Sequence, residues 1–135
     1  MKTPKDLGFI FPAEWEKHES TWLSYPHNEN SWPDKIETIF PSYNQFISEV
    51  SKGEKVNINV LDQKMQDKVL AELQEIGTKM ENIHFHQFRT NDAWCRDHGP
   101  AFVLKSNQKA IVNWDYNAWG GKYPCELDNQ IPLQI

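Results

Sequence analysis

Six side chains that commonly take part in binding or catalysis lie within the ten-residue stretch NDAWCRDHGP, residues 91–100. An ionised carboxylate such as that of Asp97 accepts paired hydrogen bonds from a planar guanidinium or amidinium group. The indole of Trp94, three residues earlier, can lie against the face of the same cation. The pattern therefore suggests a site for a planar cation. A salt bridge from Arg96 to Asp92 or another acid, with a buried tryptophan closing a turn, explains the same residues without a ligand.

The same stretch contains a thiol and an imidazole, Cys95 and His98. Such a pair is catalytic only when the two side chains lie within hydrogen-bond reach, which a spacing of three in a loop does not fix. We therefore interpret Cys95 as a small apolar side chain in a turn. His84 and His86 would share one face of a strand, a spacing that suits zinc or copper. Because no third ligand has a marked spacing to them, we expect a hydrogen-bonded strand face and no metal.

A second stretch, NAWGGKY at residues 117–123, has two adjacent glycines that allow a tight turn or a close approach to a ligand. It lacks the Gly-Lys-Ser/Thr ending of a phosphate loop. We expect a loop with Trp119 packed against it.

The elements that must position these residues follow from hydrophobic periodicity. Helices and strands alternate over the first 90 residues and a hairpin follows, which predicts an α/β fold. In the clearest helix, Met65, Val69, Leu73 and Ile76 share one face and Gly77 marks the end. The predicted strands are 20–25, 55–62, 82–89, 101–105 and 110–115. The predicted helices are 28–54, where Pro41 introduces a kink or a break, 63–80, and a final one beginning at 128–129.

Composition limits the classes of partner. The chain has 135 residues and a formal net charge of −5, which argues against a nucleic-acid partner because such proteins usually present a basic face. No apolar run is long enough for a membrane span, and the first 20 residues lack the apolar centre of a signal peptide. The two cysteines form no CxxC pair and suit a reducing compartment. We expect a cytoplasmic protein that does not bind membranes.

Three segments together resemble the N-terminal part of the agmatine deiminase family, within the wider group that includes the bacterial-type peptidylarginine deiminases. They are PAEWEKHESTWLSYPH (12–27), NDAWCRDHGPAFV (91–103), and DYNAWGGKY (115–123) followed by LDNQIP. The resemblance spans nearly the whole chain. It implies the α/β propeller of guanidino-modifying enzymes. Residues 1–135 would form the first module of the propeller and part of the next. They would thus be a truncated N-terminal part of a single deiminase domain.

The reaction that the resemblance implies is hydrolysis of agmatine to N-carbamoylputrescine and ammonia, without a metal or an organic cofactor. A cysteine thiolate attacks the guanidinium carbon, a histidine transfers protons and acidic residues hold the guanidinium. Asp97 matches the acid that binds the guanidinium, Trp94 matches the indole of that pocket, and Trp119 borders it. Asp92, Arg96 and Gly99 match the same motif, and we expect them to shape the loop.

The resemblance also implies that no catalytic residue lies within this chain. The family's nucleophilic cysteine and its His-x-Asp motif lie downstream, and neither Cys95 nor Cys125 occupies the nucleophile position. The chain alone would then be inactive. The resemblance implies that the parent enzyme takes part in putrescine and polyamine synthesis, and a homo-oligomer of the parent is possible. Two alternatives remain open: a deiminase for peptidylarginine or another guanidino substrate, and a non-catalytic module that binds a small cation or a partner protein.

Overall fold

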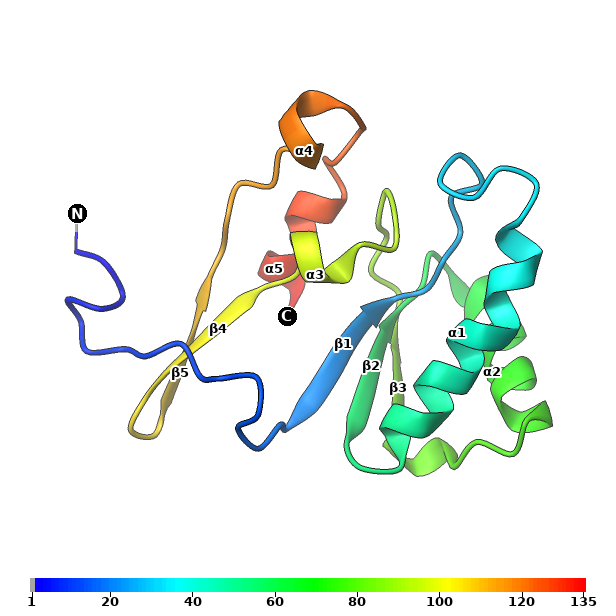
Figure 1. Ribbon diagram of the computed structural model, residues 1–135, viewed down its shortest axis with the longest axis horizontal. Helices are drawn as coiled ribbons and strands as arrows, with labels where there is room; N and C mark the ends of the chain where they lie inside the picture. The colour runs from blue at the N-terminus through cyan, green and yellow to red at the C-terminus, as the bar shows by residue number, and fades with distance from the viewer. Residues whose placement is uncertain (1) are drawn as a thin grey trace.

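The molecule combines a parallel three-stranded sheet with an antiparallel hairpin, as a computed structural model describes it for residues 2–135 (Figure 1). The sheet has the order β1-β2-β3, with bounds Ser20–Ser24, Lys55–Asn59 and Ile83–His86. Parallel neighbours require long crossover connections. Here these are the helices α1 (Ile36–Ser51) and α2 (Gln63–Glu75), which cover one face of the sheet (Figure 1). The predicted α/β class is confirmed, whereas the partial propeller stays a prediction.

The hydrophobic core lies between the sheet and the two helices. Val56 and Ile58 of the central strand β2 are completely buried, as are Val69 and Leu73 of α2 and Ile47 of α1. Burying a side chain of this size stabilises a fold by about 1.5–3 kcal/mol relative to leaving it exposed. The apolar periodicity of these segments therefore identified the core correctly.

Local signals set the ends of α2. The Asp62 side chain accepts a hydrogen bond from the Met65 backbone N–H at 2.9 Å, which satisfies one of the free donors of the first turn. Gly77 follows the helix with a φ of +77°, a left-handed conformation that glycine adopts without strain. The predicted end at Gly77 is confirmed, although Ile76 is exposed instead of lying on the buried face.

Helix α1 is shorter than the predicted range 28–54, since it begins at Ile36 and ends at Ser51, and it departs from its predicted pattern in two further respects. It runs without a break through Pro41, which is exposed. Proline has no N–H to donate, and the backbone carbonyl four residues before Pro41 can be hydrated instead. Phe46 is exposed although its spacing placed it among the core residues. The buried face instead includes Asn44, whose side-chain oxygen accepts a hydrogen bond from the Tyr25 hydroxyl at 2.9 Å and whose nitrogen donates to Glu72 at 2.8 Å.

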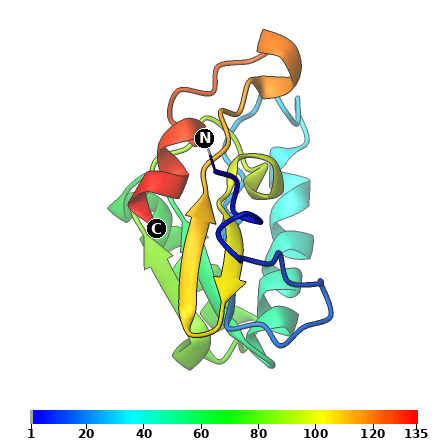
Figure 2. The ribbon, with the colours of Figure 1, turned by 90° about the vertical axis from the view of Figure 1, so that its left-hand side faces the viewer.

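The hairpin lies on the side of the sheet away from the helices (Figure 1) and consists of β4 (Ala101–Lys105) and β5 (Gln108–Val112). Strand β5 starts two residues before the predicted range 110–115, because Lys105 pairs with Gln108 across a two-residue turn. The N-terminal segment runs beside β4 (Figure 2), where Ile10 and Leu104 exchange two backbone hydrogen bonds of 2.8 Å.

Short elements complete the chain. They are η1 (Met80–Asn82), α3 (Cys95–His98), α4 (Ala118–Gly121), η2 (Asp128–Gln130) and α5 (Ile131–Gln134). The stretch 91–100, predicted as a loop, thus contains one helical turn, α3. The helical start predicted at 128–129 is confirmed. Among residues 2–135, no helix has the length and apolar content that crossing a membrane requires.

The core predicts a clear difference between neighbouring positions of α2. Leu73→Ala should lower the free energy of unfolding by about 2–5 kcal/mol, because it leaves a cavity among fully buried side chains. The control Gln74→Ala, at an exposed position, should change it by less than about 0.5 kcal/mol. Urea denaturation followed by circular dichroism measures both. Equal effects of the two substitutions would contradict this description of the core.

Candidate functional site

The loops that follow β1 and β3 meet at the carboxyl ends of the parallel strands, where ligands commonly bind in open α/β sheets. The His27 Nε2 atom lies 3.2 Å from the Thr90 carbonyl oxygen. The Asn28 side chain donates to the Asn91 carbonyl oxygen at 3.3 Å. Segments 63 residues apart in the sequence are therefore fastened together beside α3.

Asp92 holds these two loops in place. Its carboxylate accepts hydrogen bonds from the Asn28 side chain at 3.3 Å, from the Ser31 hydroxyl, and from the Ala93 backbone N–H at 2.7 Å. These contacts agree with the loop-shaping role expected for Asp92. Arg96 does not contact it, since its guanidinium pairs with Glu14 at 2.7 Å on the exposed surface.

Gly99 allows the turn α3 to end closely against its own backbone. A Cβ atom at this position would lie 2.4 Å from the Cys95 carbonyl oxygen, far inside van der Waals contact. Only glycine fits here without displacing α3, which agrees with the loop-shaping role expected for this residue too.

Helix α3 presents Trp94 and Asp97 on the same side, one turn apart. The Asp97 backbone N–H donates to the Trp94 carbonyl at 2.9 Å. The Trp94 indole is 40% exposed and stacks on Trp32, with ring centroids 5.6 Å apart. Trp94 and Asp97 therefore lie near each other on an accessible surface, and their role in binding a cation stays a prediction.

Trp119 joins the same group from the loop after the hairpin. Its indole Nε1–H donates to the Asp97 Oδ1 atom at 3.3 Å, and its ring meets Trp94 edge-on at 6.1 Å between centroids. Ala118 and Trp119 both have positive φ, at 48° and 56°, which is uncommon for residues other than glycine. Gly120 and Gly121 continue this left-handed path at 91° and 75°. Strained backbone of this kind concentrates at functional sites.

Aromatic rings surround Trp119, whose indole donates to the exposed Asp97 carboxylate. Tyr116 and Tyr123 meet Trp119 edge-on at 5.6 and 5.9 Å between centroids. Burial, together with the negative charge of Asp97, raises the pKa of the Tyr116 hydroxyl to about 12, so this group stays a neutral donor at neutral pH. Within residues 2–135, Asp97 Oδ2 makes no hydrogen bond to another side chain. A carboxylate with a free oxygen among indole rings has the features of a planar-cation site.

Cys95 and His98 are both buried behind this surface. Burial raises the pKa of the Cys95 thiol to about 11, so the nucleophilic thiolate is scarce at neutral pH. Burial lowers the pKa of His98, whose Nε2 atom lies 3.8 Å from Asp128 Oδ1. These surroundings agree with the interpretation of Cys95 as a packed side chain.

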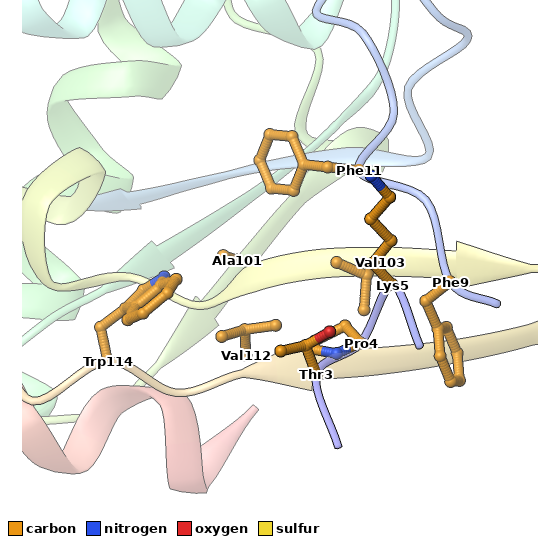
Figure 3. Close-up of a pocket in the computed structure, with 9 residues that line it drawn as sticks. All are labelled: Thr3, Pro4, Lys5, Phe9, Phe11, Ala101, Val103, Val112 and Trp114. Atoms are coloured by element: carbon orange, nitrogen blue, oxygen red, sulfur yellow. The ribbon is translucent and has the colours of Figure 1, made fainter. Parts of the chain in front are cut away.

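Two other regions lack the features of a cation site. His86 Nε2 lies 2.9 Å from the Asn57 side-chain oxygen, as expected for a hydrogen-bonded strand face. A groove of about 500 Å³ lies between the N-terminal segment and the hairpin (Figure 3). Its only charged lining residue is Lys5, so it offers no carboxylate to a cation. The lining comprises Thr3, Pro4, Lys5, Phe9, Phe11, Ala101, Val103, Val112 and Trp114.

Sequence reasoning missed Trp32, Tyr116 and Asp128 as parts of this neighbourhood. Trp32 lies in the first part of the range predicted as a helix, which precedes α1 and is not helical, and Tyr116 lies in the segment 115–123 that carried part of the resemblance, but no role followed for either residue. Asp128 lies in the LDNQIP segment that carried part of the resemblance, so a signal for that region was present although no role followed from it.

The Gly99 geometry predicts a substitution effect. Gly99→Ala should lower the free energy of unfolding by about 1–3 kcal/mol and displace α3, because the added carbon overlaps the Cys95 carbonyl. Gly53→Ala is the matched control, since its nearest neighbour would be 4.0 Å away. Thermal and urea unfolding measure both, and a Gly99→Ala protein as stable as the control would show that the close approach is absent.

The burial of Cys95 predicts selective alkylation. At pH 8 a thiol of pKa about 11 is ionised in only about one molecule in a thousand. Iodoacetamide should therefore modify the partly exposed Cys125 well before Cys95 in the folded protein, and both equally in urea. Peptide mass spectrometry over time gives the two rates. Faster labelling of Cys95 in the folded state would restore it as a reactive thiol.

Comparisons with known proteins relate the sequence and the fold of the chain to one family. The sequence profile of the Porphyromonas-type peptidyl-arginine deiminase family matches residues 10–135. The agmatine deiminase of Ectopseudomonas mendocina is 30% identical over 139 residues, which cover 98% of this chain and 36% of that protein.

Two solved structures are similar in sequence and in shape. The agmatine deiminase of Enterococcus faecalis superposes with a TM-score of 0.86 at 27% identity, over 99% of this chain and 36% of that one. A substrate-bound agmatine deiminase from C. jejuni gives 0.78 at 29% identity, over 93% and 35%. The chain thus spans about a third of the length of the relatives that it matches. It belongs to the Porphyromonas-type peptidyl-arginine deiminase family.

Proposed function

We propose that residues 1–135 form the N-terminal part of an agmatine deiminase and contribute the guanidinium-binding surface of its active site. The observation that carries the proposal is the hydrogen bond of 3.3 Å that the Trp119 indole donates to the Asp97 carboxylate, beside the accessible indole of Trp94, which meets Trp119 edge-on. Membership of the family and the similarity to named agmatine deiminases support the choice of a guanidino substrate.

In this proposal, Asp97 holds the positive charge of the guanidinium through its two oxygens. Trp94 lies against one face of the planar cation, and Trp119 orients the carboxylate and closes the side of the site. Fixing the group in one orientation prepares its carbon for attack. The attacking cysteine, the histidine and the other modules of a propeller would come from further sequence, consistent with a match to about a third of each relative.

The overall reaction is hydrolysis: a thiolate adds to the guanidinium carbon, ammonia leaves, and water releases the ureido product N-carbamoylputrescine. The chain's own contribution is binding and orientation. An isolated chain 1–135 should therefore release no ammonia from agmatine at an enzyme-like rate.

Asp97→Asn in the full-length protein tests the role of the charge. The neutral amide keeps the shape but loses the charge and one acceptor, so agmatine affinity and kcat/KM should fall by roughly 10- to 100-fold. Asp67→Asn makes the same chemical change at an exposed position of α2 and should leave both unchanged. Calorimetry and ammonia release measure the two quantities. Unchanged kinetics in Asp97→Asn would place the guanidinium elsewhere.

A second candidate is a deiminase for peptidyl arginine, which the name of the matching family favours. The indoles of Trp94 and Trp119, 40% and 44% exposed, leave room for a larger substrate in this part of the site. Ammonia release from an arginine-containing peptide, measured beside agmatine, distinguishes the two. Turnover of the peptide with no turnover of agmatine would select this alternative.

A further inference from the structure

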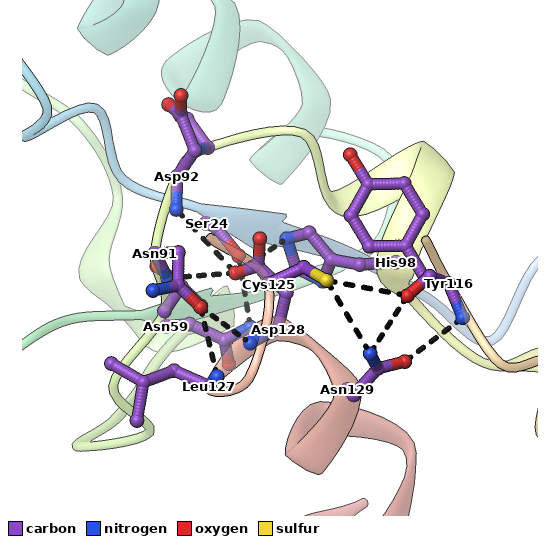
Figure 4. Close-up of polar contacts among 12 residues, drawn as sticks. Ser24, Asn59, Asn91, Asp92, His98, Tyr116, Cys125, Leu127, Asp128 and Asn129 are labelled. Atoms are coloured by element: carbon purple, nitrogen blue, oxygen red, sulfur yellow. Dashed lines mark hydrogen bonds and ion pairs between the residues drawn. The ribbon is translucent and has the colours of Figure 1, made fainter. Parts of the chain in front are cut away.

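The segment that contains η2 lies against two loops that build the cation site (Figure 4). The first of these loops follows β3, and the second follows the hairpin. Asp128 makes the contact with the first loop: its Oδ1 atom accepts hydrogen bonds from the Asn91 backbone N–H at 2.8 Å and the Asp92 backbone N–H at 3.4 Å. The Asn91 side-chain oxygen in turn accepts from the Leu127 and Asp128 backbone N–H groups at 2.8 and 3.3 Å. The Asp128 and Asn91 side chains thus each accept hydrogen bonds from backbone N–H groups of the segment that contains the other.

The next residue, Asn129, makes the contact with the second loop. Its side-chain oxygen accepts from the Tyr116 backbone N–H at 2.9 Å, and its side-chain nitrogen donates to the Tyr116 carbonyl at 2.8 Å (Figure 4). A single amide therefore pairs with both backbone groups of one residue, as a neighbouring strand would. Aspartate has the same shape but no hydrogen to donate, so it can make only one of the two bonds.

These two adjacent residues span the gap between the loops. Trp94 and Asp97 follow the Asp128-bound amides by a few positions in the sequence, and Trp119 lies three residues after Tyr116. The two sides meet in the hydrogen bond of 3.3 Å from the Trp119 indole to Asp97. The distance across the site is therefore set by where Asp128 and Asn129 hold the two backbones.

Burial makes this connection specific. Asp128 is almost completely buried, and an unpaired carboxylate there would carry a large desolvation cost, so its backbone partners are needed. The nearest ionisable group is His98, whose Nε2 lies 3.8 Å away. Neither Asp128 nor Asn129 has a hydrogen bond to the Asp97 side chain or to Trp119, within residues 2–135, so their hydrogen bonds reach the site only through the two loops.

We propose that Asp128 and Asn129 are positioning residues that set the separation of Asp97 and Trp119 and thereby tune the affinity of the cation site. The positioning itself stands on the geometry above. The effect on agmatine affinity rests on the proposed function.

Asn129→Asp is the sharpest test, since it keeps the size of the side chain and replaces the donor to the Tyr116 carbonyl by a negatively charged oxygen that repels it, and Asn129→Gln below tests the position of the amide without this added charge. The matched control is Asn113→Asp, the same change at an exposed position of the loop that contains Tyr116. Two readouts are used on the full-length protein: the indole N–H resonance of Trp119, in protein labelled with ¹⁵N-tryptophan, and the agmatine Kd. Trp119→Phe assigns the resonance, and Asp97→Asn shows its position without the charged acceptor.

The expected result is that Asn129→Asp moves the Trp119 indole signal toward its position in Asp97→Asn and weakens agmatine binding by about 10-fold, whereas Asn113→Asp changes neither. Asn129→Gln keeps the amide oxygen and the amide nitrogen on a longer side chain, so the Trp119 indole signal should lie closer to its wild-type position than in Asn129→Asp. A folded Asn129→Asp protein with wild-type signal and Kd would overturn the proposal. If Asn129→Asp does not fold, the same two readouts on Asn129→Gln and Asp128→Asn decide.

The two readouts separate this proposal from the proposed function. If the wild-type protein binds no agmatine, the proposed function fails, and the indole signal alone decides whether Asn129 positions Trp119. If Asn129→Asp displaces the indole signal but leaves the agmatine Kd unchanged, Asn129 positions Trp119 and the proposed link to affinity is wrong.

Discussion

The buried carboxylate of Asp128 is the interaction on which the arrangement of the site depends. It accepts two backbone N–H groups from the loop after β3, beside the buried ring of His98. A charge without such partners is costly in an apolar interior, so the loop and the segment around η2 must be ordered together. Once the loop is held there, α3 begins at a fixed place, and Trp94 and Asp97 point to a shared surface.

The buried contacts of Asp128 also explain how loops can hold side chains accurately enough to form a binding site. The parallel sheet and its two helices supply a rigid frame, and the loops at the carboxyl ends of its strands supply the side chains. Asp92 fastens the loop after β3 to Ser31 and Asn28 of the loop after β1, and Asn129 fastens the segment around η2 to Tyr116 at the exit of the hairpin. Hydrogen bonds made by side chains, to other side chains and to the backbone, thus replace the regular ladders that are missing from this region.

Local patterns predicted the frame well, because the periodicity of residues such as Val56, Ile58 and Leu73 reflects burial directly. The Asp97–Trp94 pair was also recognisable, since both residues lie on one short turn. Trp32 and Tyr116 were not, because tertiary contacts alone bring them to α3. The shift of β5 has a similar origin: its first residues, such as Gln108, are polar and exposed, so their strand character depends on pairing with β4.

The central claim is that the guanidinium group lies with its charge on Asp97 and one face against the Trp94 indole, with Trp119 at the side of the site. The most direct test is a crystal structure of the full-length protein with agmatine bound. The account predicts guanidinium nitrogens within about 2.7–3.1 Å of the Asp97 carboxylate oxygens, with an indole face against the cation. A guanidinium held by other acids, with Asp97 still bound only by the Trp119 indole, would contradict it.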